Sequence, residues 1–231
     1  MPIELAAMAA AAAMMTGGCS EEPTGPFELS ANVAFVSDFR YRGVSLSGED
    51  FALQGGFDVA HQSGFSAGVW ASSIEPLAGA TLELDLYAAY SLTVADTEFS
   101  LGATAFVYPD GEDFNFGELQ ASAARTLGPV DATLGVNYAW SQDNLGDEDN
   151  LYVYVNGALP LQTLVGLPLT LNGAFGYEDG VLAIEGEKLD WSLGLAMAID
   201  GIVELGATYT GTDLDDPIGD GALVFSATRA F

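Results

Sequence analysis

The sequence predicts an all-β protein, a transmembrane antiparallel up-and-down β-barrel of about twelve strands that occupies residues 27–231. Three observations predict this fold. Apolar and polar side chains alternate along almost the whole chain after residue 26, whereas the i, i+3, i+4 spacing of a helix is hard to find. Most alternating segments have 9–12 residues, the length that a tilted strand needs to cross a membrane. The connections between these segments alternate between short turns and long acidic loops, as in an outer-membrane barrel.

The first predicted strand shows the alternation most clearly. In the opening stretch FELSANVAFVSDFRYRG, every second residue from Phe27 to Tyr41 is apolar or aromatic except for one serine. The intervening positions are mostly polar and end in Asp38, Arg40 and Arg42. The same pattern predicts strands at 27–42, 51–61, 65–73, 81–92, 98–108, 116–125, 130–141, 151–159, 167–178, 189–199, 203–210 and 222–231.

The connections differ at the two ends of the predicted barrel. One set is mostly short, and the other set is longer and acidic, at 44–50, 74–80, 109–115, 142–150, 179–188 and 211–221. With a periplasmic N-terminus, the short turns face the periplasm and the acidic loops face outwards.

The segments DNLGDED and DLDD carry oxygen ligands that suit Ca²⁺ or Mg²⁺, but they lack EF-hand spacing, so solvated loops are expected. No segment is long enough for an obvious folded plug, although 179–188 or 211–221 could fold inward.

Aromatic side chains on the apolar parity gather at two levels. The outer level contains Phe39, Tyr41, Tyr138, Trp140, Tyr177, Trp191 and Tyr209, and the inner level contains Phe27, Phe65, Tyr90, Phe99 and Phe231. Two such girdles are typical of membrane barrels, because amphipathic rings favour the headgroup region. The alternative is a soluble β-sandwich with these aromatics in its core. Arg125 and Arg229 share the apolar parity but fall near periplasmic strand ends, where an arginine can snorkel to the interface.

Both ends of the chain predict export to the outer membrane. Residues 1–19 contain an Ala/Met-rich apolar run followed by small residues, as in a signal peptide, and 20–26 form a polar linker. The run from Thr16 to Cys19 resembles a lipoprotein lipobox, which makes Cys19 a candidate lipidation site. It departs from the pattern because Thr16 replaces the usual leucine and no Lys or Arg precedes the apolar run. At the other end, Phe231 closes a strand that resembles the signal read by the outer-membrane assembly machinery, so that machinery and outer-membrane lipids are expected partners.

The composition excludes several functions. The chain has 33 acidic and 5 basic residues and a net charge of −28, which excludes nucleic-acid binding. Its single Cys excludes an internal disulfide framework. One His and one Cys cannot build a zinc cluster, and the sequence predicts neither a metal centre nor a cofactor.

The polar parity places a mainly acidic set of side chains in the lumen or at its rims: Glu28, Asp38, Asp58, Glu83, Asp85, Glu118, Asp190 and Glu204. Only Arg40 and Arg42 oppose them. We expect these two arginines to form a constriction in the outer half of the lumen together with Asp38, Glu83, Asp85, Glu118 and Asp190. Because rings of carboxylates select cations, weak cation selectivity follows. The arginines could equally pair with neighbouring carboxylates to hold the first strand, a role that is compatible with pore lining.

The stretches ANVAFVSDFRYRGVSLS, LQGGFDVAHQSGFSAGVWAS and LELDLYAAYS together resemble the TorF family of porins, formerly a proteobacterial family of unknown function. The likeness is clearest over 27–92 and continues more loosely to Phe231. It implies an exported barrel in the bacterial outer membrane with porin activity, and it implies no particular substrate. With the small polar side chains of the lumen, it predicts passive diffusion of ions or small polar solutes.

Two other functions stay open at this point. A non-conducting structural or adhesive outer-membrane barrel would have the same strands and a blocked lumen. Outer-membrane phospholipases are twelve-stranded and use a His-x-Ser pair, and this chain contains His61-Gln62-Ser63. The predicted register puts that pair at a periplasmic turn, whereas the phospholipase site lies toward the outer leaflet, so no enzyme activity is expected.

Overall fold

The computed structural model of the chain describes residues 25–77, 79–111, 114–162, 166–184 and 186–231. The predicted signal peptide at 1–19, its Cys19 and most of the predicted linker at 20–26 lie outside these residues.

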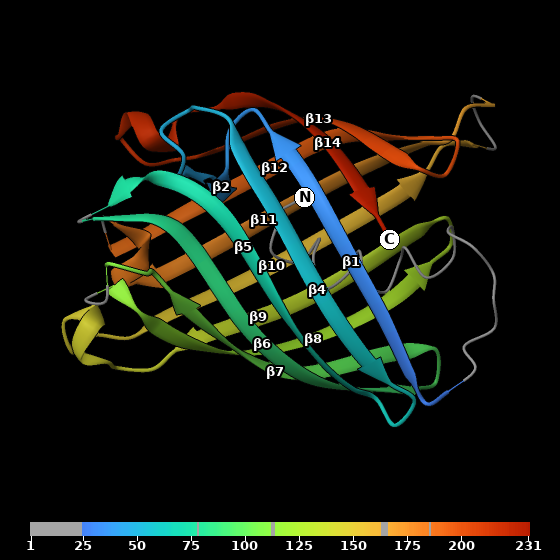
Figure 1. Ribbon diagram of the computed structural model, residues 1–231, viewed down its shortest axis with the longest axis horizontal. Helices are drawn as coiled ribbons and strands as arrows, with labels where there is room; N and C mark the ends of the chain where they lie inside the picture. The colour runs from blue at the N-terminus through green and yellow to red at the C-terminus, as the bar shows by residue number, and fades with distance from the viewer. Residues whose placement is uncertain (1–24, 78, 112–113, 163–165, 185) are drawn as a thin grey trace.

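The described residues form a closed barrel of twelve antiparallel strands, which confirms the predicted fold class (Figure 1). Its strands are β1 (Phe27–Val36), β4 (Ala52–His61), β5 (Phe65–Leu77), β6 (Ala80–Val94), β7 (Thr97–Val107), β8 (Phe116–Leu127), β9 (Val130–Ala139), β10 (Asn150–Pro160), β11 (Leu169–Gly180), β12 (Gly186–Ile199), β13 (Val203–Thr212) and β14 (Ala222–Ala230). Each strand pairs with its neighbour in sequence, and β1 closes the barrel by pairing with both β4 and β14.

The barrel is apolar outside and polar inside. Along the strands, large apolar side chains are exposed, such as Leu193 at 59% and Phe225 at 56%, while their polar neighbours are buried, such as Glu118 and Glu178 at 0% and 1%. Because strand side chains point alternately to the two faces of a sheet, the buried set points into the barrel. This distribution is the reverse of a soluble protein's and rules out the sandwich alternative.

Short 3₁₀ helices lie in the connections, among them η2 (Asp143–Leu145), η3 (Val181–Ala183) and η4 (Pro217–Gly219). No helix within the described ranges is long and apolar enough to cross a membrane.

The prediction of one strand over 27–42 is wrong at its end. β1 stops at Val36, and the chain then turns into a hairpin of β2 (Arg40–Tyr41) and β3 (Val44–Ser45). Its two turn residues, Arg42 and Gly43, have φ angles of 46° and 83°. Positive φ at both positions is the mark of a type I′ turn, which the right-handed twist of a two-residue hairpin favours.

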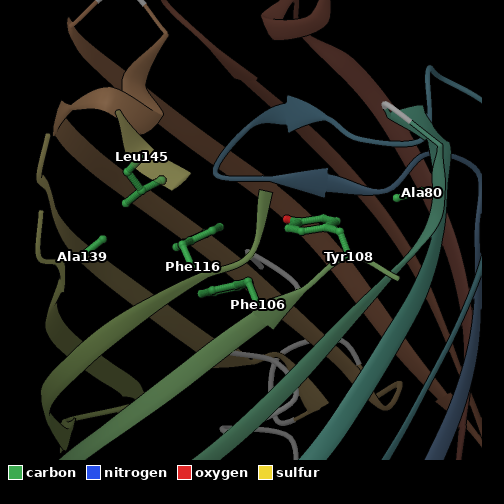
Figure 2. Packing of buried hydrophobic residues seen from close by; sticks show 6 residues of the cluster. All are labelled: Ala80, Phe106, Tyr108, Phe116, Ala139 and Leu145. Atoms are coloured by element: carbon green, nitrogen blue, oxygen red, sulfur yellow. The ribbon is translucent and has the colours of Figure 1, made fainter. Parts of the chain in front are cut away.

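This hairpin lies inside the barrel (Figure 2), so a segment other than 179–188 and 211–221, the two expected to be able to fold inward, enters the lumen. Phe39 at its base is fully buried, and its ring centroid lies 5.3 Å from that of Trp70 on β5. Tyr41 packs edge-on against Phe106 of β7 at 5.9 Å. Neither Phe39 nor Tyr41 therefore belongs to the outer aromatic girdle.

The wall opposite the hairpin base carries an aromatic cluster at the same end of the barrel (Figure 2). Its buried members are Ala80, Phe106, Tyr108, Phe116, Ala139 and Leu145. The rings of Phe106 and Phe116 stack with centroids 4.4 Å apart. Tyr41 packs against this cluster, so the hairpin is held by apolar contacts as well as by charges.

Candidate functional site

Arg42 at the hairpin tip joins two distant parts of the barrel wall. Its Nη1 donates to Glu178 Oε1 on β11 at 2.5 Å, and its Nη2 donates to both carboxylate oxygens of Glu118 on β8 at 2.7 Å. The guanidinium carbon lies 4.5 Å from the ring centroid of Tyr41 and 4.2 Å from that of Tyr152. The hairpin follows β1, and both β11 and β8 lie far from β1 around the barrel. β11 is reached from β1 through β14, β13 and β12, and β8 is reached through β4, β5, β6 and β7. The tip therefore crosses the lumen to its far wall.

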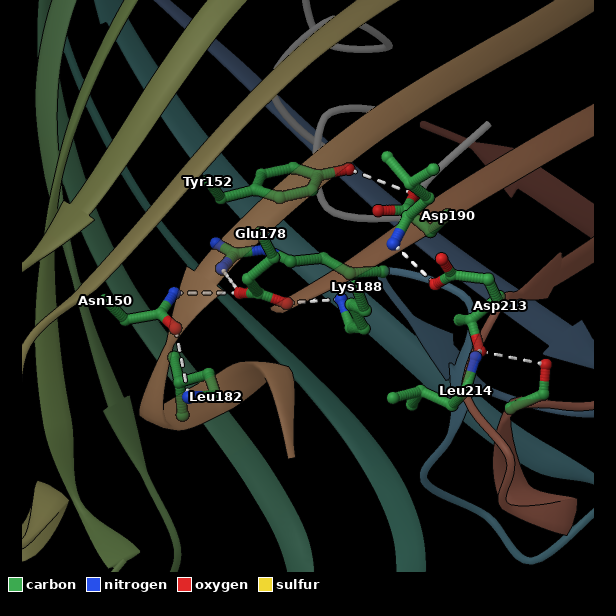
Figure 3. Close-up of polar contacts among 12 residues, drawn as sticks. Asn150, Tyr152, Glu178, Leu182, Lys188, Asp190, Asp213 and Leu214 are labelled. Atoms are coloured by element: carbon green, nitrogen blue, oxygen red, sulfur yellow. Dashed lines mark hydrogen bonds and ion pairs between the residues drawn. The ribbon is translucent and has the colours of Figure 1, made fainter. Parts of the chain in front are cut away.

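Glu178 is the centre of the charged network (Figure 3). Besides Arg42, it forms an ion pair with Lys188 of β12 and accepts a hydrogen bond from Asn150 Nδ2 of β10 at 2.8 Å. The side-chain oxygen of Asn150 accepts from the backbone N–H of Leu182 in η3 at 3.0 Å. A single carboxylate thus holds two cations and links three strands with a loop.

A second ion pair holds the base of the hairpin. Arg40 Nε donates to Asp38 Oδ2 at 2.5 Å, and Arg40 Nη1 donates to the backbone carbonyl of Asp220 at 2.6 Å. The other oxygen of Asp38 accepts from the hydroxyls of Ser45 and Ser47 at 2.7 and 3.1 Å. Arg40 therefore connects the hairpin with the β13–β14 loop and does not face the far wall.

Three further carboxylates, those of Glu83, Asp85 and Asp190, are buried in the barrel, and two of them accept a hydrogen bond from a tyrosine hydroxyl. The Tyr108 hydroxyl donates to Glu83 Oε2 at 2.7 Å, and the Tyr152 hydroxyl donates to Asp190 Oδ1 at 3.1 Å. One oxygen each of Glu83, Asp85 and Asp190 makes no hydrogen bond within the described part of the chain. All three residues are at most 5% exposed. The ion pairs described above include none of these three carboxylates.

The buried ionisable side chains leave the interior acidic. Among the described residues, the buried acids are Asp38, Glu83, Asp85, Glu118, Glu178 and Asp190, and the buried bases are Arg40, Arg42 and Lys188. Six acids against three bases give a formal charge of −3.

The structure buries all seven residues of the predicted constriction and brings some of them into contact. Arg42 contacts Glu118, and Arg40 contacts Asp38, as the pairing alternative described. Glu83, Asp85 and Asp190 are buried in the same interior. That these seven residues line the constriction of a conducting pore stays a prediction.

Sequence reasoning missed Glu178, Lys188, Tyr152 and Asn150. The signal for Glu178 was present, because the outward Tyr177 next to it on β11 implies that Glu178 points inward. Lys188 shares the inward parity of Asp190 but falls in the predicted 179–188 loop, whereas β12 already begins at Gly186.

Gly176 makes room for the Tyr152 side of this site. It pairs across the strands with Asp190, and a Cβ at this position would collide with the Tyr152 hydroxyl and lie 2.5 Å from Asp190 Oδ2. We expect Gly176→Ala to push Tyr152 off the Arg42 guanidinium and to lower the free energy of unfolding by about 1–3 kcal/mol. Denaturant unfolding followed by fluorescence measures this loss. Gly173→Ala on the same strand is the control, because its Cβ would meet nothing closer than 3.7 Å.

His61 and Ser63 form a local contact in the β4–β5 turn. The His61 Nδ1 and the Ser63 hydroxyl lie 2.7 Å apart, and the backbone N–H of Ser63 also donates to this nitrogen at 3.2 Å. The contact is exposed and joins residues two apart. It therefore has the geometry of a turn stabilised by its own side chains.

The comparison with protein families matches residues 20–230 to the family described as "Bacterial protein of unknown function (Gcw_chp)". None of the curated proteins compared with the chain matches it. Among solved structures, the KdgM porin superposes with a TM-score of 0.61 at 7% identity, over 87% of this chain and 98% of that one. The NanC porin gives 0.56 at 9%, over 88% and 98%.

A third structure, the COG4313 outer membrane channel from Pseudomonas putida F1, gives a TM-score of 0.53 at 14% identity, over 93% of this chain and 99% of that one. At such identities the likeness shows a shared barrel fold.

Proposed function

The chain belongs to the Gcw_chp family of bacterial proteins, and we propose that it is a diffusion channel of the bacterial outer membrane for ions or small polar solutes. One observation carries this proposal: a closed barrel with an apolar outside and a charged inside. A lipid-facing surface explains why so many large apolar side chains are exposed. In this proposal residues 1–19 are a signal peptide with Cys19 as a candidate lipidation site, 20–26 a linker, and 27–231 the membrane domain related to TorF porins.

The C-terminal strand supports the outer-membrane location. Phe231 and Ala31 exchange backbone hydrogen bonds of 2.8 and 3.2 Å, so the last residue lies where β14 closes the barrel against β1. A terminal aromatic at that seam fits recognition by the outer-membrane assembly machinery. The short turns at the same end as Phe231 would face the periplasm, and the hairpin would close the outer half of the lumen.

The charge of the interior favours cations over acidic solutes. One solved structure that shares the fold is described as "KdgM porin in complex with disordered oligogalacturonate", and oligogalacturonate is an acidic sugar chain. Among the residues that the structure describes here, the buried acids outnumber the buried bases by six to three. A polyanion would be repelled there, whereas a small cation or a neutral polar solute would not.

Reversal potentials in a KCl gradient test the function and its selectivity together. We expect the refolded protein to conduct in planar bilayers and to prefer K⁺ over Cl⁻. We expect the double variant Glu83→Gln/Asp85→Asn to lose part of that preference in alkaline buffer, where both buried carboxylates are ionised. Preference for Cl⁻ in the wild-type protein would contradict cation selectivity.

The hairpin favours a second candidate, a non-conducting structural or adhesive barrel. Its tip is held on the far wall by two carboxylates, so the lumen is crossed by protein. Absence of both ionic current and liposome swelling by small sugars would favour this candidate over the channel. The similar barrels are porins and channels, so we propose no enzymatic role, and Ser63→Ala should change no lipid-hydrolysis rate.

A further inference from the structure

We propose that Glu118, Glu178 and Tyr152 form a binding site for an organic cation with a guanidinium or alkylammonium group. Arg42 occupies this site in the structure in place of such a solute. This binding site adds a class of solute to the proposed channel function. Only the route by which the solute reaches the site rests on that proposed function.

The three side chains proposed to bind the cation all belong to strands of the barrel wall. Glu118 comes from β8, Tyr152 from β10 and Glu178 from β11, whereas Arg42 comes from the hairpin. Two carboxylates and the face of an aromatic ring are the groups that recognise a planar cation. The wall therefore holds both carboxylates and one aromatic ring of the site, and the hairpin supplies the cation and the second ring, that of Tyr41.

The receptor groups need a cation in this position. Without Arg42, Glu118 would lose both hydrogen bonds that its carboxylate oxygens accept from the guanidinium. Glu178 would keep Lys188 and Asn150. Burying a carboxylate such as Glu118 without a cation is costly, so any small cation that fits between the two carboxylates would be stabilised there.

A further acceptor lies beside the site. The Tyr152 hydroxyl donates to Asp190 Oδ1, and the other oxygen of Asp190 lacks a hydrogen-bond donor among the described residues although Asp190 is only 4% exposed. Figure 3 shows Asp190 next to Tyr152, on the side away from Asn150. A solute with a second donor group, such as a diamine or a guanidino amine, would find an acceptor at that position.

The hairpin keeps the site filled in the wild-type protein. Arg42 is tethered to the wall by its own chain, so its effective concentration at the two carboxylates is high and a free solute competes poorly. Shortening this side chain should expose the site, and the Arg42→Ala variant is therefore the protein in which to measure binding.

The test measures the thermal unfolding of refolded Arg42→Ala in detergent with low-millimolar guanidinium chloride and with sodium chloride of equal ionic strength. We expect guanidinium at about ten times its dissociation constant to raise the Tm by roughly 3 °C over sodium. The same pair of salts should not differ for Arg42→Ala/Glu118→Gln, which lacks one recognition group. Arg229→Ala is the control variant, because Arg229 is exposed on the outside of the barrel. It shows whether guanidinium raises the Tm after the loss of any arginine. If Arg42→Ala does not refold in sodium chloride, guanidinium should restore its folded, heat-modifiable band.

Equal Tm values and equal folding yields in the two salts would overturn the binding site. The outcome is separable from the channel function. An Arg42→Ala barrel that conducts ions but ignores guanidinium would remove the site and keep the channel. A barrel that binds guanidinium but passes no current would keep the site and remove the channel.

Discussion

Replacing residues 37–51 by Asn-Gly is expected to raise the single-channel conductance several-fold. Val36 and Ala52 are paired across β1 and β4, so a two-residue turn can join the strands directly, and Asn-Gly suits the type I′ geometry. The replacement removes the whole hairpin, including Arg42 and its contacts with the far wall. Twelve tilted strands give a backbone diameter of about 24 Å, so the lumen without the hairpin has room for water and small solutes.

The control for this variant is the turn between β6 and β7. Ala95 and Asp96 have φ angles of 49° and 64°, the same positive-φ turn geometry, at the end of the barrel away from the hairpin. Replacing them by Asn-Gly changes a turn of the same type but leaves the lumen as it is, so the conductance should equal that of the wild type. A hairpin-free protein with wild-type conductance would show that the hairpin does not limit the current.

The barrel could be predicted from the sequence because each strand carries its own local evidence. In β12, for example, Leu189, Leu193 and Leu195 alternate with Lys188, Asp190 and Gly194, so that one short segment specifies which face is polar. The same parity correctly directs Glu83, Asp85 and Glu118 to the interior. A strand-by-strand pattern therefore specifies the wall and the side chains that it turns inward.

The hairpin could not be predicted in the same way. The alternation that begins at Phe27 continues through Phe39 and Tyr41, although the chain leaves the wall after Val36. Alternation shows that one face is apolar, and it does not distinguish a lipid-facing residue from one that packs inside the lumen, as Phe39 does against Trp70. Only the Arg-Gly pair at the tip is a local sign of a turn.

The ion pairs of the site depend on contacts that no local pattern contains. Arg42 and Glu178 are 136 residues apart, and Arg42 and Glu118 are 76 apart. Parity places each of these side chains inside, but which of them touch depends on how far the hairpin reaches. The inward direction of Glu118 was predictable, and its partner was not.

Glu178→Gln is expected to destabilise the barrel by about 3–5 kcal/mol, because it breaks a buried charge network by removing one partner. Glutamine fills nearly the same volume and can still accept from Asn150, so the loss comes from charge. Lys188 would lose the carboxylate with which it pairs, and Arg42 would lose one of its two carboxylate partners. Urea unfolding of the refolded protein, followed by tryptophan fluorescence, measures the change in the free energy of unfolding.

Glu187→Gln is the matched control for this loss. Glu187 neighbours the network on β12 but is exposed, where it accepts from the Tyr177 hydroxyl at 2.9 Å, so its removal should cost less than about 1 kcal/mol. Adding Lys188→Met to Glu178→Gln should recover part of the stability, because no buried lysine is then left without a carboxylate. If Glu178→Gln were as stable as Glu187→Gln, the charge of Glu178 would not hold the hairpin, and the tip would owe its position to the packing of Tyr41 and Phe39.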